Sequence, residues 1–455
     1  MNKKVVILGA VAAGSKVAAK VKRDKPNYEV VIYTKDENVS YSACGMPYYI
    51  GNLINNIDDL IVRTVEEFEE NGIQIYLKSE CVKVDFQNKK VIIKNLITNK
   101  NIEDNYDVLV IATGASPVIL NIEGVRSENI FTLRNLADAK NIKEKALASK
   151  TVTIVGGGYI GIELLENFRR LGLKVNLIET SNFIMNNFDE KFSELIKEHI
   201  EKKEGDNVRF YLNEEIEKFL QIEEMFVGTK CKNAGLIKSD FVVLCTGIKP
   251  NTDFLLDTEI EFSIKNTIKV DRKLRTNIQD VYACGDCADK NFLVTQKPVW
   301  FALGTTANKE GRVVALNVCN KDDKFLGVTG AVVTKYFDFI MSSVGISEKI
   351  ARKMGFNTVS SMVVKQDKPS YMPNSKDVYF KLVVDKKSHK ILGAQALGSA
   401  NADKAINIIS SAILGDMTIE KLVDIDLSYA PPVSATIDAL ITAAWNIKDK
   451  LSFYK

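Results

Sequence analysis

Histidine is nearly absent from this 455-residue chain, which contains only His199 and His389. Two isolated histidines do not supply the grouped ligands of a zinc site, so no metal site is predicted. No apolar run approaches the roughly 20 residues that cross a bilayer. The net charge of +3 is small for this length, and it gives no reason to expect a nucleic acid or a membrane as partner.

The cysteines lack the pattern of a disulfide-stabilised secreted domain. There are seven, an odd number, scattered over a long chain, whereas such domains are short and carry paired cysteines. Cys284 and Cys287 form a C-x-x-C pair, which is compatible with zinc or redox chemistry. Cys44, in the segment SYSACGMPYYIG, has four possible roles: a packed apolar residue, a disulfide partner, a metal ligand or a nucleophile.

Length and composition indicate a soluble globular protein of two to four domains, with 46% apolar and 26% charged residues. The opening MNKK followed by VVILGAVAAG imitates a signal peptide. A buried strand that runs into a glycine turn and a helix would have the same composition. The same pattern recurs in mid-chain, where no signal peptide can lie, so we favour the strand and expect a cytoplasmic protein.

The mid-chain copy is TVTIVGGGYIGIELLENFRRLGLKVNLIE. It predicts a strand over 152–155, a helix over 160–171 that stops at Gly172, and a strand over 174–178. The helix is preceded by G-x-G-x-x-G, formed by Gly156, Gly158 and Gly161. Such glycines let the backbone approach a pyrophosphate at the positive helix N-terminus. Glu179 ends the second strand, where a carboxylate accepts hydrogen bonds from an adenosine ribose. We therefore predict a dinucleotide site.

The N-terminal copy contains Gly9 and Gly14, but Val11 replaces the middle glycine, so by itself it is a weak match. Two further segments, YDVLVIATGASP and FVVLCTGIKPN, predict apolar strands that end in T-G turns. NIQDVYACGDCAD predicts a strand that ends at Gly285 and Asp286. In such a turn the carboxylate can face a sugar-alcohol chain, which leaves the two flanking cysteines as packing residues.

After about residue 325 the pattern changes to a third, α+β domain. The segment KDVYFKLVVDKKSHKILGAQALG predicts a hairpin with strands over 378–384 and 391–397. A helical stretch, ADKAINIISSAILGD, follows it.

Together these features resemble the pyridine nucleotide-disulfide oxidoreductases, which are FAD-dependent homodimers. The resemblance implies an α/β fold with two Rossmann-like dinucleotide-binding domains, one for FAD and one for NAD, and a C-terminal α+β dimerisation domain. We expect the FAD-binding domain at 1–118 and 250–325, the NAD(P)H-binding domain at 119–249 and the dimerisation domain at 326–455.

The branch of the family follows from the cysteine. Glutathione and lipoamide reductases carry a C-x4-C pair and a C-terminal catalytic histidine, but Tyr49 stands where the second cysteine would be and His389 lies in a predicted hairpin turn. The motif S-x-x-x-C-G-x-P-Y, from Ser40 to Tyr48, instead resembles coenzyme A-disulfide reductases and NADH oxidases. The opening G-A-V-A-A-G and the Y-A-P-P that begins at Tyr429 are similar to the coenzyme A-disulfide reductases. The resemblance implies that Cys44 is the redox nucleophile and that Tyr429 reaches the active site of the partner subunit.

Three positions depart from the family pattern. Thr34 stands where an acid for the FAD ribose is usual, so Asp36 or a backbone group is expected to substitute. The paired-tyrosine motif Y-Y-P reads Tyr371-Met372-Pro373. Ala12 occupies the place of a histidine that related peroxidases and some oxidases use in oxygen chemistry.

A single cysteine cannot close an internal disulfide, so its oxidised form is a mixed disulfide or a sulfenic acid. The first implies reduction of coenzyme A disulfide, persulfide or polysulfide, and the second implies reduction of oxygen or peroxide. Pro47 suits the first position of a short helix, which would place Cys44 just before the positive helix end and lower the pKa of its thiol.

Lys16, Lys20 and Arg23 share one face of the first predicted helix, opposite an apolar face. They form either a solvated basic face or, as the resemblance implies, the groove for the coenzyme A phosphates. The remaining predicted substrate residues are Ser40, Arg63 and Tyr371.

The resemblance and the motifs also predict a set of cofactor-binding residues. These are Gly9, Ala12, Gly14, Thr34, Lys35, Asp36, Ala112, Thr113, Gly114, Gly156, Gly158, Tyr159, Ile160, Gly161, Glu163, Glu179, Gly247, Gly285, Asp286 and Ala302. We expect NADH rather than NADPH, because Glu179 would repel a 2′-phosphate. The predicted function is reduction of coenzyme A disulfide, persulfide or polysulfide. The alternatives are an NADH oxidase and a flavoprotein redox sensor or electron-transfer partner.

Overall fold

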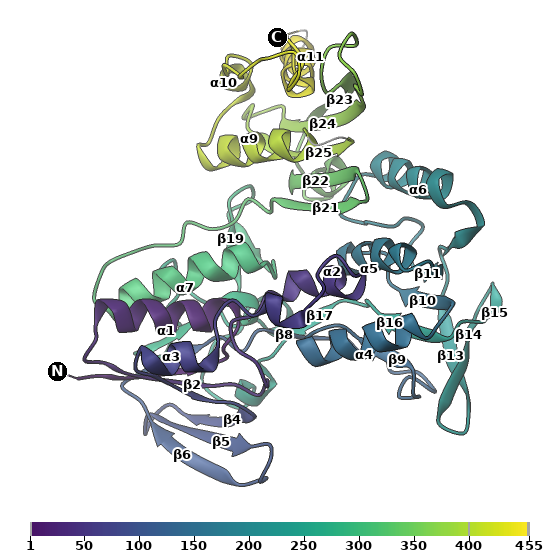
Figure 1. The fold of residues 1–455 in the computed structure, drawn as a ribbon. Helices are drawn as coiled ribbons and strands as arrows, with labels where there is room; N and C mark the ends of the chain where they lie inside the picture. The colour runs from purple at the N-terminus through teal and green to yellow at the C-terminus, as the bar shows by residue number, and fades with distance from the viewer. Residues whose placement is uncertain (1, 399–400, 453–455) are drawn as a thin grey trace.

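The N-terminal segment forms the centre of a parallel five-stranded sheet. The computed structural model describes residues 2–398 and 401–452, and many of its elements are labelled in Figure 1. The sheet has the order β18-β7-β1-β2-β3. Its strands are β1 (Lys4–Leu8), β2 (Glu29–Tyr33), β3 (Ile73–Tyr76), β7 (Val108–Ile111) and β18 (Val281–Ala283). Because β1 pairs with both β2 and β7, the prediction of a strand at the N-terminus is confirmed.

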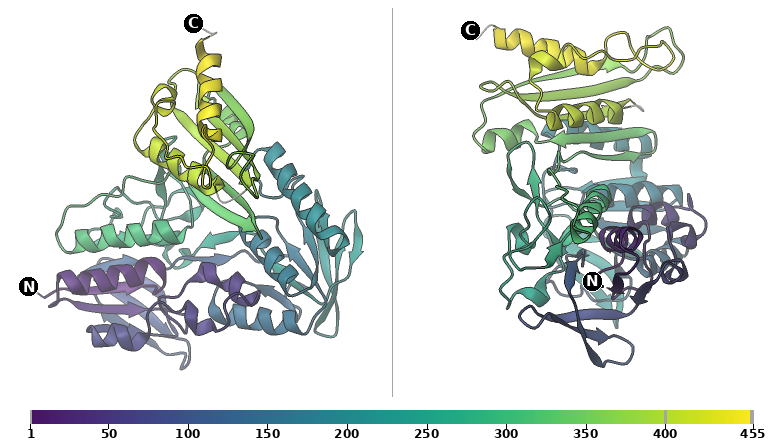
Figure 2. Two further views of the ribbon diagram at one scale, coloured as in Figure 1. Left: turned by 45° about the horizontal axis from the view of Figure 1, so that its top comes forward. Right: turned by 90° about the vertical axis from the view of Figure 1, so that its left-hand side faces the viewer.

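Two long helices cover one face of this sheet side by side, as both views of Figure 2 show. They are α1 (Ala12–Asp24) and α7 (Gly304–Val318). The helices can approach closely because Gly311 has no side chain. A Cβ at this position would lie 2.6 Å from the carbonyl oxygen of Ala13. The shorter elements nearby are α2 (Met46–Ile50), α3 (Val65–Glu70), β4 (Ser79–Asp85), β5 (Lys90–Asn95), β6 (Asn101–Asn105), β19 (Lys290–Phe292) and β20 (Lys297–Val299).

A second parallel sheet has the order β12-β11-β10-β16-β9. Its strands are β9 (Ile130–Thr132), β10 (Thr151–Val155), β11 (Lys174–Ile178), β12 (Val208–Tyr211) and β16 (Phe241–Leu244). Its helices are α4 (Leu136–Leu147), α5 (Tyr159–Arg170) and α6 (Glu190–Glu204), and a small sheet adds β13 (Ile216–Ile222), β14 (Met225–Cys231) and β15 (Gly235–Ile237). The predicted strand–turn–helix–strand unit is confirmed.

The two parallel sheets are joined by a pair of short antiparallel strands, β8 (Ala115–Pro117) and β17 (Ile248–Pro250). Asn251 holds them together, since its side-chain amide donates to Thr113 O (2.9 Å) and its side-chain oxygen accepts from Ser116 Oγ (2.7 Å). The chain therefore leaves the first sheet and returns to it at one point, directly after the two predicted T-G turns.

The C-terminal part is an antiparallel sheet of order β21-β22-β25-β24-β23 with helices packed on it. Its elements are β21 (Val332–Tyr336), β22 (Phe339–Gly345), α8 (Glu348–Lys353), β23 (Thr358–Gln366), β24 (Asp377–Asp385), β25 (Ile391–Gly398), α9 (Ala402–Leu414), α10 (Ile419–Leu422) and α11 (Ala439–Ser452). The predicted hairpin, helical stretch and α+β character are confirmed. The order of the sheets agrees with the predicted order of domains, whose boundaries stay a prediction.

Among the helices of the described residues, none combines the length and the apolar character needed to cross a membrane.

Candidate active site

Cys44 lies in a short 3-10 turn, Ala43–Gly45, directly before α2. The predicted short helix is confirmed, although it begins one residue earlier, at Met46. A Cβ at Gly45 would lie only 2.3 Å from Leu60 Cδ2, so a side chain directly after Cys44 would force Leu60 to move. Among the seven cysteines, all of them described, only Cys44 has an exposed side chain. The turn therefore presents one thiol at the surface.

The electrostatic environment of Cys44 differs from the prediction. The residue keeps an exposed surface, but protein atoms crowd the sulfur, and this burial raises the pKa of the thiol. The carboxylates of Glu163 and Asp286 raise the pKa further, and the guanidinium of Arg134 lowers it in part. The prediction that the helix lowers the pKa of the Cys44 thiol is therefore wrong. The helix α2 has only five residues, and the effect of its N-terminus is smaller than the combined effect of burial and two carboxylates.

Cys284 and Cys287 are fully buried. The Cys287 thiol donates to Ile111 O at 3.3 Å, and both residues are free thiols. The prediction that they are packing residues beside the Gly285–Asp286 turn is therefore confirmed.

The two glycine turns have the same local geometry. Gly9 and Gly156 have φ of +108° and +109°, and a Cβ on them would lie 2.2 Å from Ala112 O and 2.3 Å from Cys245 O. In each turn the last glycine touches the first, since a Cβ at Gly14 would lie 1.9 Å from Gly9 O. Both turns thus leave backbone exposed at the start of a long helix, which suits a pyrophosphate.

The middle position of the turn does not require glycine in this chain. Val11 has φ of −93°, and Gly158, its counterpart in the second turn, has φ of −82°. A Cβ at Gly158 would meet no atom within 4 Å. The valine that weakened the first sequence match is therefore compatible with the turn, and the residues present fit a bound dinucleotide.

The carboxylate of Glu179 lies at the end of β11, beside the second glycine turn. It accepts hydrogen bonds from Gly157 N (2.8 Å) and Ser181 N (2.9 Å). These two backbone groups fix the carboxylate where a ribose would approach the turn.

The corresponding end of β2 is built differently. Thr34 is buried, and its hydroxyl oxygen accepts from Asp36 N at 3.3 Å. Asp36 is half-buried, and burial raises the pKa of its carboxyl while the charges of the exposed Lys35 and of Arg134 lower it. Asp36, rather than Thr34, thus offers a carboxylate at this edge of the sheet.

Sequence reasoning missed Arg134. Its Nη2 atom lies 3.6 Å from Asp286 Oδ2 and 3.0 Å from the position that a Cβ at Gly114 would take. The same charge acts on Asp36 and on Cys44. The sequence signal was weak, since a single arginine after a three-residue strand has no characteristic pattern.

Glu163 connects the second dinucleotide unit to Cys44. It lies on α5, its Oε1 atom accepts from Thr334 Oγ1 at 3.2 Å, and burial raises the pKa of its carboxyl to about 7. Burial raises the pKa of Cys245, and the Glu163 charge adds to this effect. Tyr159 and Ile160 begin the same helix, and the Tyr159 hydroxyl accepts from Asn187 Nδ2 at 2.7 Å.

The remaining predicted cofactor residues lie at the same edges. Thr113 donates from Oγ1 to Asn251 O at 2.7 Å, and Gly114 and Gly247 have φ of +70° and +98° in the two T-G turns. Ala302 lies two residues before the start of α7 at Gly304. Ser40, a predicted substrate residue, has φ of +48° and donates from its backbone N to Ala10 O at 2.8 Å.

The basic residues of α1 have different surroundings. Lys16 is exposed, whereas Lys20 Nζ lies 2.6 Å from Asp24 Oδ1 and Lys321 pairs with the same carboxylate. Arg23 and Arg63 line one cavity of about 480 Å³. The cavity is also lined by Ala19, Lys22, Pro26, Glu67, Phe68, Glu70, Asn71 and Ile73. The structure thus brings the two arginines together and leaves Lys20 in an ion pair.

Tyr371 and Tyr429 lie together but away from Cys44. A hydrogen bond to Tyr429 raises the pKa of Tyr371, and the two side chains are 71% and 47% exposed. Tyr371 lies between β23 and β24, and Tyr429 follows α10. These elements are at the top of Figure 1, while α2 is in the middle of the molecule. Within one chain, the structure does not bring either tyrosine to the cysteine.

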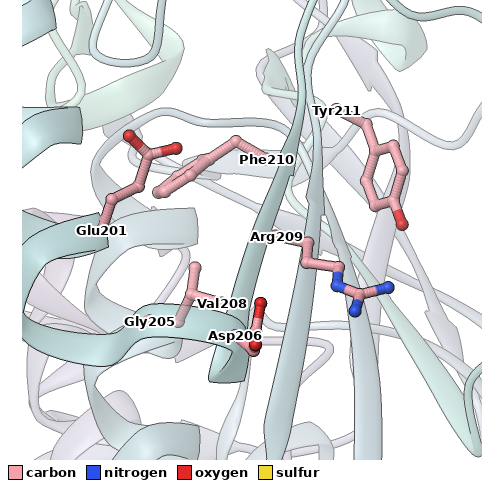
Figure 3. Close-up of a pocket in the computed structure, with 7 residues that line it drawn as sticks. All are labelled: Glu201, Gly205, Asp206, Val208, Arg209, Phe210 and Tyr211. Carbon is pink, nitrogen blue, oxygen red and sulfur yellow. The ribbon is translucent and has the colours of Figure 1, made fainter.

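A second cavity, of about 450 Å³, lies at the edge of the second sheet, between α6 and β12. Figure 3 shows its lining residues, which are Glu201, Gly205, Asp206, Val208, Arg209, Phe210 and Tyr211. It contains no cysteine and no predicted site residue.

Comparison with protein families agrees with this arrangement. Residues 3–311 match the model described as pyridine nucleotide-disulphide oxidoreductase, and residues 332–441 match the dimerisation domain of the same family. The chain belongs to the pyridine nucleotide-disulphide oxidoreductases. Membership implies FAD and a pyridine nucleotide as cofactors, and the predicted fold class is confirmed.

Individual relatives have several named activities. The chain is 33% identical to an NAD(P)H coenzyme A polysulfide/persulfide reductase of Pyrococcus horikoshii over 98% of this chain and 99% of the relative. It is 30% identical to a coenzyme A disulfide reductase of Staphylococcus epidermidis over 97% and 98%. Its structure resembles that of a water-forming NADH oxidase of Lactobacillus brevis bound to NADH, with a TM-score of 0.94, 26% identity and complete coverage of both chains.

Proposed function

We propose that this protein is an FAD-dependent NADH oxidoreductase that reduces coenzyme A disulfide, persulfide or polysulfide through Cys44. One observation carries the proposal. The only exposed thiol of the chain lies within the electrostatic reach of Asp286, from the first dinucleotide unit, and of Glu163, from the second. A sulfur between the two units is suited to receive electrons that pass from the nucleotide of the second unit to the nucleotide of the first and then to the sulfur.

The cofactor roles follow from the two turns. FAD would be held by the turn of Gly9 and Gly14, with Asp36 and Asp286 at its sugars and Arg134 nearby. When bound, FAD supplies the two-electron relay from the nicotinamide to sulfur. NADH would be held by the second turn with Glu179 at its ribose. Thr180 and Ser181, which follow that acid, bring no cation for a 2′-phosphate, which supports a preference for NADH.

The sulfur chemistry at Cys44 balances with one disulfide and two electrons. The Cys44 thiolate attacks one sulfur of the substrate, the substrate S–S bond breaks, and one coenzyme A thiolate leaves. A mixed disulfide between Cys44 and coenzyme A remains. Two electrons then break this bond, which restores the Cys44 thiolate and releases the second coenzyme A thiolate. Each leaving thiolate takes up one proton.

The proton donor that we assign is Tyr429 of the partner subunit. Both histidines lie on other elements, His199 on α6 and His389 in the turn between β24 and β25, and the chain's own Tyr429 follows α10. The exposed apolar side chains of the C-terminal domain support a homodimer, since they would otherwise meet water. They include Val364 (49% exposed), Val433 (62%) and Trp445 (43%). The match to a dimerisation domain supports the same assembly.

The cavity that Arg23 and Arg63 line supports a nucleotide-bearing substrate. Two guanidinium groups on one cavity suit the diphosphate and the 3′-phosphate of coenzyme A, because arginine binds phosphate oxygens in a bidentate manner. Oxygen and peroxide need no such site. Ala12, at the place of the histidine that related peroxidases and some oxidases use, also favours sulfur reduction.

The proposal is tested by NADH consumption under argon with coenzyme A disulfide, coenzyme A persulfide or inorganic polysulfide, and in air without an added acceptor. The coenzyme A acceptors are expected to support the fastest turnover. Cys44→Ser should keep FAD and accept hydride from NADH but lose every sulfur activity, because the electrons then have no sulfur to reach. Cys81→Ser, at a buried cysteine of β4, is the matched control. Fast NADH oxidation in air with no response to coenzyme A acceptors would establish the oxidase instead.

A further inference from the structure

A fully buried ion pair lies beneath the Gly285–Asp286 turn and has no part in the chemistry described above. Lys290, in β19, and Glu310, in the middle of α7, have side chains that are 1% and 0% exposed. The Lys290 Nζ atom lies 3.5 Å from Glu310 Oε1. The two residues belong to a strand and a helix that are separate in sequence, so only the tertiary structure brings them together.

The pair binds both polar backbone groups of one residue. Glu310 Oε2 accepts a hydrogen bond from Gly285 N at 2.7 Å. Lys290 Nζ donates to Gly285 O at 2.8 Å and to Ala288 O at 2.9 Å. The peptide groups before and after Gly285 are therefore each held by a charged side chain, and charge-assisted hydrogen bonds are the stronger class.

Packing holds Gly285 from the other side. Its φ is +78°, and a Cβ there would lie 3.1 Å from the Cβ of Ala13 and 3.8 Å from that of Ala307. Ala13 belongs to the first turn of α1, the helix that follows the first glycine turn. The Gly285 backbone is thus fixed between α1, α7 and the ion pair.

Stability alone does not account for such a pair. A buried ion pair costs desolvation, and well-packed apolar residues are often as stable. In the described part of the chain, Glu310 Oε1 has no hydrogen-bond partner. Burial raises the pKa of the Glu310 carboxyl to about 7, against the opposing charge of Lys290. The ion pair therefore carries a desolvation cost, and its clear structural effect is to fix the orientation of the Gly285 backbone.

The next residue shows what this orientation positions. Asp286 O is already bound, since it accepts from Trp300 Nε1 at 2.7 Å. The Asp286 carboxylate is partly exposed and lies 3.6 Å from Arg134. The side chain of Asp286 is therefore the group that the fixed turn presents outward.

We propose that Lys290 and Glu310 are positioning residues for FAD, which clamp Gly285 so that the Asp286 carboxylate faces the sugar-alcohol chain of the cofactor. The inference rests on the proposed function, and in particular on the FAD role of Asp286. It does not depend on the identity of the sulfur substrate.

The test is titration of the apoprotein with FAD, followed by flavin fluorescence, for Glu310→Gln, Lys290→Met and the double variant. Glutamine keeps an acceptor for Gly285 N but leaves the Lys290 charge unpaired. Each single variant is expected to raise the FAD dissociation constant about tenfold or more, since an unpaired buried charge distorts its surroundings. The double variant, which buries no charge, should fold best and still bind FAD more weakly than the wild type. Glu261→Gln, in an exposed pair with Lys269 at 2.7 Å, is the matched control.

The melting temperature of each apoprotein separates positioning from simple stability. If the variants melt earlier but bind FAD within about twofold of the wild type at a temperature where they are folded, the proposal is overturned. Asp286→Asn is measured in parallel. Wild-type FAD affinity in that variant would also overturn the proposal, because the clamp would then position nothing. Neither result bears on the sulfur chemistry, which fails separately if coenzyme A acceptors are not reduced.

Discussion

Arg23 and Arg63 line the same cavity, although Arg23 lies in the last turn of α1 and Arg63 in the loop before α3. Arg63 lies over the ring of Phe68, 5.9 Å from its centroid, which holds its side chain at the cavity. The two residues bring guanidinium groups from two separate segments to one cavity, which Lys22, Glu67 and Glu70 also line.

The double variant Arg23→Ala/Arg63→Ala is expected to raise the KM for coenzyme A disulfide roughly tenfold or more, with little change in kcat. Each arginine would contact phosphates that do not react, so its loss weakens substrate and transition state alike. Steady-state kinetics with coenzyme A disulfide measures the effect. Reduction of inorganic polysulfide, which carries no nucleotide, should hardly change.

Arg209→Ala is the matched control, because Arg209 is exposed and lines the other cavity. FAD content is measured for every variant, since α1 also supports the first glycine turn. An unchanged KM for coenzyme A disulfide with full FAD content would show that the cavity is not the substrate site.

The role of Tyr429 is tested by mixing two inactive subunits. Cys44→Ser and Tyr429→Phe should each lose most coenzyme A disulfide reduction as homodimers. A mixed dimer contains one intact site, formed by Cys44 of one subunit and Tyr429 of the other. Random mixing should restore about a quarter of the wild-type activity, because half of the dimers are mixed and each mixed dimer has one intact site out of two.

No recovery after verified subunit exchange would mean that Tyr429 does not act across the dimer. Tyr371→Phe serves as the comparison, because Tyr371 is hydrogen-bonded to Tyr429. Its loss should affect the activity less than the loss of the proposed donor.

Glu179→Arg is expected to shift the preference from NADH toward NADPH, by roughly tenfold or more in the ratio of kcat/KM values. The substitution removes the carboxylate that would repel the 2′-phosphate and introduces a cation. Anaerobic flavin reduction with each nucleotide measures the change directly. Glu198→Arg, at an exposed position of α6, controls for the added charge, and an equal shift in that variant would contradict the assignment.

Glu163→Gln is expected to lower the pKa of Cys44 in the apoprotein. The ionised carboxylate disfavours the thiolate, and its removal takes this repulsion away. The Glu163 carboxyl has a pKa of about 7, so it is ionised over the alkaline range in which a thiol of raised pKa titrates. The pH dependence of Cys44 alkylation by iodoacetamide, followed on its peptide by mass spectrometry, measures the shift.

Arg134→Met should move the same profile toward higher pH, because Arg134 lowers the pKa of Cys44. Opposite shifts in the two variants are expected, and Glu261→Gln should leave the profile in place. A shift in the same direction for both variants would indicate a general disturbance of the turn rather than these two charges.

Local sequence patterns determined the elements and the family of this protein. Glycine spacing and apolar periodicity predicted β11 at Lys174–Ile178, the helix after Gly158 and the C-terminal hairpin, because turn sterics and side-chain alternation act between residues close in sequence. The motif around Cys44 indicated the single-cysteine branch for the same reason.

Only the tertiary structure decided which charges surround Cys44 and that Arg23 and Arg63 line one cavity. The same is true of the hydrogen bonds with which Lys290 and Glu310 hold Gly285. A short helix beside the cysteine predicted a low thiol pKa. Burial of the sulfur raises the pKa instead, and the carboxylates of Glu163 and Asp286, which are remote in sequence, add to this effect. Electrostatic interaction depends on distance and on burial, and both are set by how separate segments pack. A pattern within one segment can therefore identify the nucleophile, while its reactivity follows from the fold.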